Sequence, residues 1–421
     1  MKIEMVNHAS VIFSKGEVNL ITDPWIEGSV FQEGWSLLAT TKFTFEDFSR
    51  ITHIWFSHEH PDHFFPPNIK KIPAEIKKNI TVLYHKTNDR KVVEYCEKQG
   101  FKEVIELEPN KEYELAKDFS IINTPFGHDS WLYVKTEEFT YLNTNDCVLN
   151  TPEKISRVSK IVGQIDVLMT QFGYACKYGN IDEKDQREAA VQRKYNQMQL
   201  QIDTFKPSIF MPIASFVWFS HEENFYMNDA INTIDRVDRF ISEQNIKPLV
   251  LYPGEVNIVG ESHDNSSSIE KYMIDYSNIS IENTRRTVSA SFEEMSENAS
   301  KLVDKIKKDL IVRIAISFYP VKIYLPDLNK TVKFSVGRGL REIQDKKENV
   351  NLIMTSEVLN YCLKFDWGFS TTNVNARFQT VGPKDLKLFN YYVSVTDSFN
   401  HEDSTWKRMV KKLFRKIGLK K

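Results

Sequence analysis

Histidines and carboxylates gather in one short stretch, Ser57 to His63, directly after an apolar run. The candidate ligands are His58, His60, Asp62 and His63. Imidazole and carboxylate are the side chains that suit zinc, iron or manganese. So many such groups within a few positions make a metal centre the first hypothesis, against the alternative of a solvated polar loop.

The spacing divides these ligands into two pairs. The preceding run, residues 51–56, is short, apolar and rich in β-branched and aromatic residues, as in a buried strand. In an extended chain, His58 and His60 point to the same face. Pro61 keeps His60 extended and then turns the chain, so Asp62 and His63 point in another direction. One loop can therefore serve two neighbouring divalent metals, zinc or iron, with manganese as a further option.

Two more polar residues interrupt the opening strands. Alternating residues predict a β-meander over residues 1–25, with His8 before the second strand and Asp23 at the end of the third. His8 is either a surface histidine or a residue near the site. Asp23 is either a turn former or an acid that orients a metal-bound histidine.

Two later residues also follow predicted strands. His128 sits on a turn with Gly127, and Asp146 ends the strand-like segment that begins at Phe139. Either residue alone is more often a turn former than a ligand. Together with the first cluster they become ligand candidates, and an aspartate at a strand end can bridge two cations.

Aromatic residues gather in two further segments of the chain. Trp25, Phe31 and Trp35 lie in a glycine-containing loop, and Trp218 and Phe219 follow much later. The loop either packs as a small core or forms a lid or pocket wall over the metals. An aromatic-lined approach suits sugars, bases and acyl chains alike, so the expected substrate is a small molecule.

Composition describes an ordinary soluble protein. The 421 residues are 41% hydrophobic and 27% charged, which is typical of globular chains long enough for two domains. The net charge of −2 gives no general attraction to nucleic acid, and none is expected as a partner. Four widely spaced cysteines, with neither a signal peptide nor a transmembrane run, predict a cytoplasmic location.

Four segments are expected along the chain. Residues 1–265 form the metal-binding domain, 266–291 a serine-rich boundary, and 292–404 an α+β accessory domain that serves dimerisation, covers the site or binds a substrate tail. Residues 405–421 form a basic amphipathic tail. The tail either docks on its own domain, which we favour, or makes peripheral contact with an anionic membrane.

The pattern H-x-H-x-D-H, with an earlier aspartate after a meander and a later glycine-histidine turn, resembles the metallo-β-lactamase superfamily over about the first 260 residues. The resemblance implies an α/β fold, an αββα sandwich. It also implies a ligand set and a supporting residue. His58, His60 and His128 would hold one metal, Asp62 and His63 a second, Asp146 would bridge them, and Asp23 would support them.

One position departs from the superfamily pattern. Relatives often place the last ligand in a proline-x-histidine, where this chain has Pro212, Ile213 and Ala214. Alanine cannot bind a metal, so a substitute is needed. His221 is the preferred one and His263 the second choice. If neither reaches the site, the centre is mononuclear.

A closer resemblance is to the catalytic region of the cytidine-monophosphate-N-acetylneuraminate hydroxylase family. It rests on the aromatic loop after Asp23 and on the segments 214–224, 252–255 and 367–372. That hydroxylase family carries a Rieske cluster held by paired cysteine and histidine motifs, and these motifs are absent from the 421 residues. Electrons for such chemistry would come from a separate donor protein.

Three functions remain open at this stage. The leading hypothesis is a dinuclear metallohydrolase that activates water against an ester, amide or phosphodiester, with Asp62 or Asp146 orienting the hydroxide. The second is a non-haem iron oxygenase that acts on an amino sugar or nucleotide sugar. The third is a binding protein that retains metal without catalysis.

Overall fold

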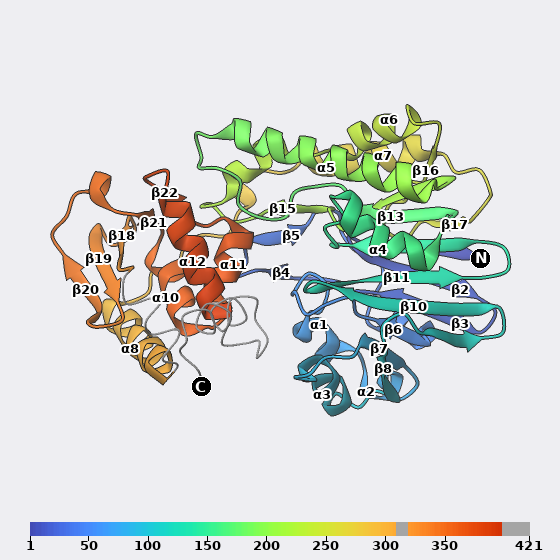
Figure 1. Cartoon of the computed structure of the whole chain (residues 1–421), viewed down its shortest axis with the longest axis horizontal. Coiled ribbons are helices and arrows are strands. Elements are labelled where there is room, and N and C mark those ends of the chain that lie inside the picture. Colours follow the sequence, from blue (N-terminus) through green and yellow to red (C-terminus); the bar gives the residue numbers. More distant parts are fainter. Residues whose placement is uncertain (309–318, 398–421) are drawn as a thin grey trace, which may run out of the picture.

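Two seven-stranded sheets form the larger part of the protein (Figure 1). The computed structural model describes residues 1–308 and 319–397. The first sheet has the order β17-β1-β2-β3-β6-β7-β8 and the second β16-β14-β13-β12-β11-β10-β9. The strands of the first sheet are β1 (Lys2–Asn7), β2 (Ser10–Lys15), β3 (Val18–Thr22), β6 (His53–Trp55), β7 (Thr81–His85), β8 (Glu103–Leu107) and β17 (Val256–Ile258). Those of the second are β9 (Glu112–Ala116), β10 (Phe119–Phe126), β11 (Asp129–Lys135), β12 (Thr140–Asn145), β13 (Val167–Gln171), β14 (Ile209–Ile213) and β16 (Lys247–Pro248).

Helices cover both outer faces. Near β6 to β8 lie α1 (Pro66–Lys71), α2 (Ala74–Lys77) and α3 (Lys91–Lys98). Near the second sheet lie α4 (Pro152–Val162), α5 (Lys184–Phe205), α6 (Ile234–Ser242) and α7 (Asn265–Ser277). The α/β sandwich expected from the sequence is confirmed.

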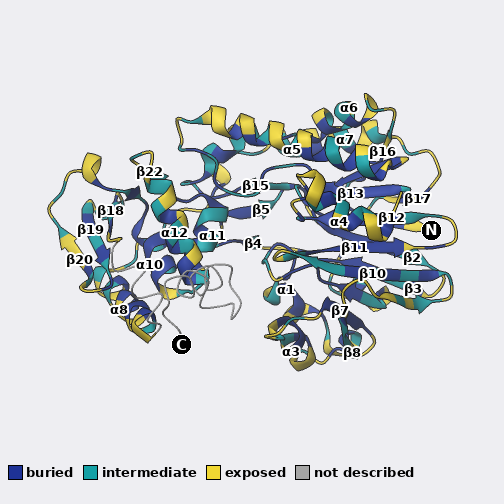
Figure 2. Ribbon diagram, in the orientation of Figure 1, coloured by how far each residue is buried: buried dark blue, intermediate teal, exposed yellow. Residues whose placement is uncertain are grey.

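Neighbouring residues on the strands of the first sheet belong to two different hydrophobic cores, one on each face of the sheet. On β6, Trp55 joins the core between the sheets, whereas its neighbour Ile54 joins the core under the outer helices. On β7, Leu83 and Val82 divide in the same way. Successive side chains of a strand point to opposite faces, so a sheet that is covered on both faces contributes to two cores. Figure 2 shows that the central strands of both sheets are mostly buried.

The C-terminal residues form a second body with its own core. A five-stranded sheet, β20-β19-β18-β21-β22, packs with α8 (Phe292–Lys308), α10 (Ser356–Lys364), α11 (Gly368–Asn375) and α12 (Asp385–Asp397). Its strands are β18 (Val321–Leu325), β19 (Lys330–Ser335), β20 (Gly339–Ile343), β21 (Leu352–Ile353) and β22 (Gln379–Thr380). Between this body and the sandwich lies a small sheet, β15-β5-β4, of Val217–Phe219, Trp35–Leu37 and Ser29–Val30.

The segment expected as a boundary, residues 266–291, begins inside a helix of the sandwich. Tyr272 of α7 is fully buried and stacks on Phe216, with ring centroids 4.3 Å apart. The serine-rich composition at 265–268 reflects the first turn of this helix, where the Asp264 side chain accepts a hydrogen bond from the Ser266 amide. The predicted tail, residues 405–421, lies outside the described residues.

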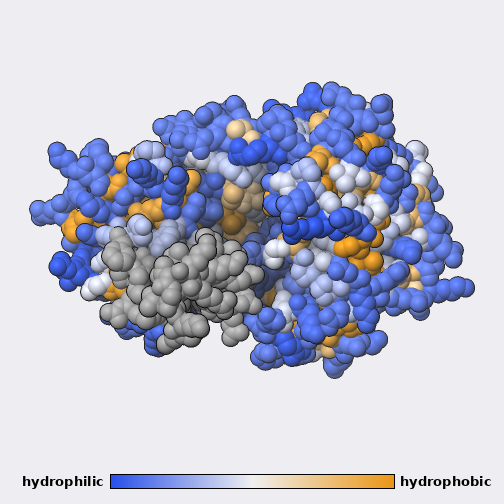
Figure 3. All heavy atoms as spheres, in the orientation of Figure 1, coloured by the Kyte–Doolittle hydropathy of each residue, from blue (hydrophilic) through white to orange (hydrophobic). Residues whose placement is uncertain are grey.

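Figure 3 shows one face of the molecule, coloured by hydropathy. The face shown in Figure 3 is mostly hydrophilic, and its apolar residues lie in scattered patches. Across residues 1–308 and 319–397, no helix combines the length and the apolar character needed to cross a bilayer.

Arg187 ties α5 to the segments near the C-terminal body. The side chain is fully buried, forms two hydrogen bonds of 2.8 Å with Asp229, and donates to the carbonyl of Asn180 at 2.6 Å. We expect Arg187→Met to lower the free energy of unfolding by about 2 kcal/mol, since it removes the charge-assisted hydrogen bonds of a buried guanidinium to a partly exposed carboxylate and to backbone carbonyls. Urea unfolding followed by circular dichroism measures this. Arg157→Ala removes an exposed pair with Glu153 and should change stability by less than about 0.5 kcal/mol; equal effects would contradict the prediction.

Candidate metal centre

Loops from both sheets meet at one edge of the sandwich. Ser57 follows β6 of the first sheet, and Ser130 of β11 in the second sheet donates a hydrogen bond to its carbonyl at 2.6 Å. This contact brings the histidine stretch against the β10–β11 turn. The ends of β3 and β12 join the same place through Asp23 and Asn145, which also contact Ser57.

One group of candidate ligands consists of His58, His60 and Asp129. Their ligand atoms all lie within 4.8 Å of one another. The Nε2 atom of His58 is 2.9 Å from Nδ1 of His60 and 3.5 Å from Oδ1 of Asp129. Two imidazoles and one carboxylate thus face a common point.

A second group consists of His8, Asp62 and His63, all buried. The Oδ2 atom of Asp62 lies 3.2 Å from Nε2 of His63 and 3.5 Å from Nε2 of His8. This group repeats the composition of the first, two imidazoles and one carboxylate. His8 supplies the second imidazole of this group and lies beside position 214, where the chain has alanine.

Asp146 lies between the two groups. Its Oδ2 atom is 3.4 Å from Nε2 of His63, and it forms a third close group with His63 and His58. Because His58 and His63 belong to the first and second groups respectively, Asp146 occupies the position from which a carboxylate can bridge two cations.

Unpaired buried atoms show that the second group suits a cation. Among the described residues, Nδ1 of His8 and Oδ1 of Asp62 are buried without a hydrogen-bond partner, and Nε2 of His63 faces the carboxylates of Asp62 and Asp146 at 3.2 and 3.4 Å. Unsatisfied buried polar atoms are costly and rare in native proteins. A divalent ion that accepts these lone pairs would remove that cost.

The electrostatics of the first group also favour a cation. Burial and the neighbouring charge of Asp146 raise the pKa of the Asp129 carboxyl to about 6. Burial, together with His63 and His60, lowers the pKa of His58 well below its usual value, so its imidazole is neutral and free to coordinate. A positive ion would stabilise the ionised form of Asp129.

Asp23 contacts the candidate ligand His63 on the side of the imidazole that faces away from the centre. Its carboxylate accepts hydrogen bonds from the amide and hydroxyl of Ser57, both at 2.7 Å, and lies 3.0 Å from Nδ1 of His63. The side-chain amide of Asn145 also donates to it. A carboxylate on Nδ1 fixes the imidazole so that Nε2 faces the centre, which is the usual support of a metal-bound histidine.

Strained backbone marks the strand ends around this centre. His8, Asp23, Asn145 and Ala214 have φ values of 45°, 38°, 46° and 54°. Left-handed φ is uncommon for residues other than glycine and persists where the surroundings enforce it, often at functional sites. Ala214 takes part directly, since its amide donates to the carbonyl of His8 at 2.9 Å. Position 214 thus supports the backbone of His8.

Other predicted residues lie elsewhere. His128 is exposed on the turn and falls outside the close groups formed by the described residues, and its neighbour Asp129 occupies the centre in its place. The sequence located this turn, but the direction of each side chain depends on the two-residue connection at Gly127 and His128, which the pattern alone did not resolve. The structure shows that β11 begins at Asp129, so this side chain and not that of His128 lies on the strand.

The two proposed substitutes for position 214 belong to separate surroundings. His221 is buried beside Glu223 and Glu357, and burial with the nearby Arg377 lowers its pKa to about 3. His263 lies 2.9 Å from the carbonyl of Val250. Neither histidine joins the groups at the strand ends.

The aromatic residues form a core beside the centre. Trp25, Phe31 and Trp35 are buried in one cluster with Phe219, and Trp218 is half-buried. The edge of Trp25 packs on His8, with ring centroids 5.7 Å apart. The loop thus packs as a small core, and that core also contacts the candidate ligands His8 and His60.

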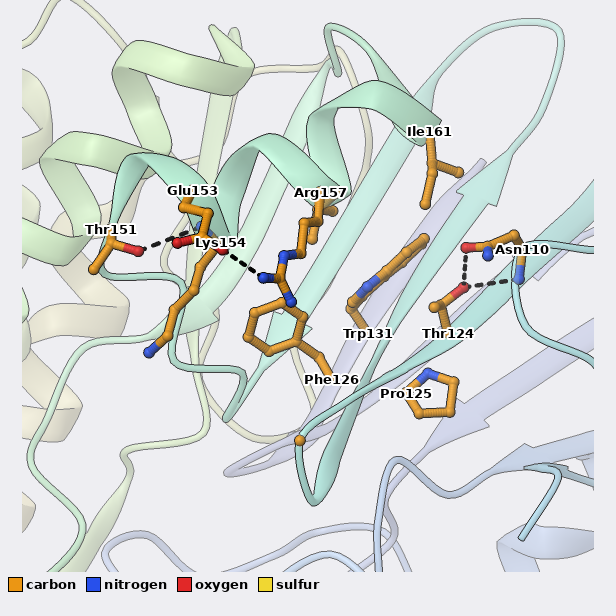
Figure 4. Close-up of a pocket in the computed structure, with 12 residues that line it drawn as sticks. Asn110, Thr124, Pro125, Phe126, Trp131, Thr151, Glu153, Lys154, Arg157 and Ile161 are labelled. Atoms are coloured by element: carbon orange, nitrogen blue, oxygen red, sulfur yellow. Dashed lines mark hydrogen bonds and ion pairs between the residues drawn. The ribbon is translucent and has the colours of Figure 1, made fainter. Parts of the chain in front are cut away.

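A surface groove of about 700 Å³ lies between the β10–β11 hairpin and α4 (Figure 4). Trp131 and Phe126 of the hairpin face Arg157 of the helix across it. The groove extends to Gly127, so it adjoins the turn that precedes Asp129.

Part of the sandwich matches the model of a known protein family. Residues 2–173 match the model of the beta-lactamase superfamily domain. These residues contain both ligand groups and are similar to a beta-lactamase superfamily domain, as the resemblance implied.

Individual curated proteins are similar to this chain at low sequence identity. The chain is similar to the cytidine monophosphate-N-acetylneuraminic acid hydroxylase of Xenopus laevis, 24% identical over 274 residues, which are 62% of this chain and 46% of the relative. It spans less than half the length of the first curated relatives it matches.

Two solved structures are similar over 61% of this chain. The diiron β-hydroxylase CmlA of Streptomyces venezuelae matches over 54% of its length, with 17% identity and a TM-score of 0.44. A possible metal-dependent hydrolase of Veillonella parvula matches over 98%, with 13% identity and a TM-score of 0.44.

Replacing His8 tests the second ligand group. We expect His8→Ala to lose about half of the bound metal, because Asp62 and His63 alone complete a site poorly. Elemental analysis after dialysis against excess metal measures the content. His221→Ala removes an equally buried histidine and should keep the wild-type content; the reverse pattern would reject His8 as a ligand.

Replacing Asp23 tests the support of His63. We expect Asp23→Asn to weaken metal binding by about 10–100-fold, the usual cost of losing such a partner. Competition with a chromogenic chelator gives the affinity. Asp166→Asn is the control, because Asp166 accepts the same pair of hydrogen bonds, from the amide and hydroxyl of Thr140, at the opposite end of β12. An unchanged affinity in Asp23→Asn would refute the role.

Proposed function

We propose that the protein is a dinuclear non-haem iron oxygenase that hydroxylates a small molecule. The observation that carries this proposal is the composition of the two ligand groups. His58, His60 and Asp129 would hold one iron, and His8, His63 and Asp62 the other. Sets of two histidines and one carboxylate with open positions are typical of non-haem iron oxygenases.

Asp129 is the residue that changes the expectation. With His128 in the centre, the first site would have three histidines, a set familiar from catalytic zinc. A carboxylate in that place gives a more anionic site of two histidines and one carboxylate, the set that non-haem iron oxygenases use. Asp146, between the two groups, would bridge the pair.

When bound, the iron pair would supply dioxygen activation. The overall reaction inserts one oxygen atom into a substrate C–H bond and releases the other as water, which takes two electrons and two protons. An electron-donor protein of the ferredoxin or Rieske type would supply the electrons. The similarity to hydroxylases supports an amino sugar or nucleotide sugar as the substrate class.

The chain's own residues would prepare this chemistry. Asp23 holds His63 in one orientation, and the Ser57 hydroxyl lies 2.9 Å from Nδ1 of His58. Burial of His58, Asp62 and His63 keeps bulk water from the ligands and so limits side reactions of the activated oxygen.

A metallohydrolase is the second candidate. The position of Asp146 between the two groups favours it, since the same carboxylate could orient a water shared by two zinc ions. Its substrates would be esters, amides or phosphodiesters.

Metal exchange distinguishes the two functions. We expect protein reconstituted anaerobically with Fe(II) to consume dioxygen when a chemical reductant is supplied, and protein reconstituted with zinc to consume none. An oxygen electrode measures the rate, and Mössbauer spectroscopy shows whether the irons are coupled. Asp129→His should lower oxygen uptake at least 10-fold while binding metal, and His128→Ala should match the wild type. Ester or phosphodiester hydrolysis by the zinc form, without oxygen uptake by the iron form, would establish the hydrolase instead.

A further inference from the structure

The loop between β4 and β5 contains three consecutive left-handed residues. Phe31, Gln32 and Glu33 have φ values of 51°, 56° and 59°. Left-handed conformation is unfavourable for each such residue and normally occurs singly. A run of three therefore needs strong contacts from outside the loop.

These contacts come partly from the C-terminal body. The amide of Asn375 donates to the carbonyl of Phe31 at 3.0 Å, and the guanidinium of Arg377 donates to the carbonyl of Gln32 at 2.9 Å. The next two carbonyls are bound by the 220–224 segment. Asn224 donates to Gly34 at 2.9 Å, and the Ser220 hydroxyl donates to Glu33 at 3.3 Å.

The donors are themselves fixed. Arg377 is buried and bonds to the carboxylates of Glu223 and Glu357 at 2.5 and 2.8 Å. The backbone carbonyl of Asn375 accepts a hydrogen bond from Asn224 at 2.7 Å. A Cβ on Gly34 would lie 2.5 Å from Cβ of Asn375, so only glycine permits this approach.

The loop between β4 and β5 contacts the candidate metal centre through Phe31. The ring of Phe31 packs edge-on against Trp35, at 4.8 Å between centroids, and against the candidate ligand His60, at 6.2 Å. Ala376 joins the same buried cluster. Contacts therefore run without a break from residues 375–377 to the imidazole of His60.

We propose that Asn375 and Arg377 are positioning residues for the metal centre. Their hydrogen bonds hold the left-handed loop, and the loop fixes the imidazole of His60 through Phe31. The C-terminal body thus takes part in building the first ligand group. The role of His60 in this inference rests on the metal centre proposed above.

Two variants of the full chain test this inference. Asn375→Ala removes the donor to Phe31. Arg377→Lys keeps a positive charge for the two glutamates but loses the forked geometry that also reaches Gln32. Asn180→Ala is the matched control, because Asn180 bonds to the backbone of Thr380 in the same C-terminal segment without contacting the loop.

Two measurements separate the loop from the metal. Hydrogen exchange of a peptide covering residues 28–36, in metal-free protein, reports on the loop alone. The visible absorption of the cobalt(II)-loaded protein reports on the geometry of its ligands. We expect both positioning variants to exchange at least 10-fold faster in this peptide and to show shifted cobalt bands, and the Asn180 variant to match the wild type in both.

Each other outcome is decisive. Unchanged exchange in both variants, or equal acceleration in the Asn180 variant, would overturn the role of Asn375 and Arg377. Faster exchange with unchanged cobalt bands would overturn the link from the loop to His60. A wild-type protein that binds no cobalt would reject the proposed metal centre, and the positioning of a ligand with it, whereas the exchange result would still report on the loop contacts.

Discussion

The candidate metal centre depends on the hydrogen bonds that the buried carboxylate of Asp23 accepts. This carboxylate lies at the end of β3 and is almost completely buried, and it collects donors from Ser57 after β6 and from Asn145 at the end of β12. A buried acceptor of this kind must keep its partners, because losing one leaves a charge without compensation. The need to satisfy one carboxylate therefore fixes the ends of strands from both sheets together. The candidate ligands next to those ends then have little freedom.

The sequence predicted the architecture better than the direction of individual side chains. Alternation at residues 18–22 matches β3, and the four ligand candidates after residue 56 do lie in one loop at a strand end. The third histidine was expected at His128, but Asp129 lies in the centre. A shift of one residue at a tight turn reverses which side chain points inward, and periodicity cannot resolve it there. Likewise, the proximity of His8 to Asp62 depends on tertiary pairing of β1 with the rest of the sheet.

The alanine at position 214 takes on a new meaning in the structure. From the sequence it was a missing ligand, which called for a distant substitute such as His221. In the fold, its amide supports the carbonyl of His8, and both residues adopt left-handed backbone. The chain thus has alanine directly after β14 and presents a histidine from the turn between β1 and β2. The two ligand groups end with equal composition, two histidines and one carboxylate each.

The contacts of Arg377 also carry a consequence for synthesis of the chain. The carbonyl of Gln32 is bound by a residue 345 positions later. During translation, a ribosome that has released the whole sandwich has not yet supplied the donors for the loop beside His60. The loop that packs on His60 would therefore take its final shape only after the last body emerges. A chain cut short before residue 375 would then lack the donors that hold the loop beside His60.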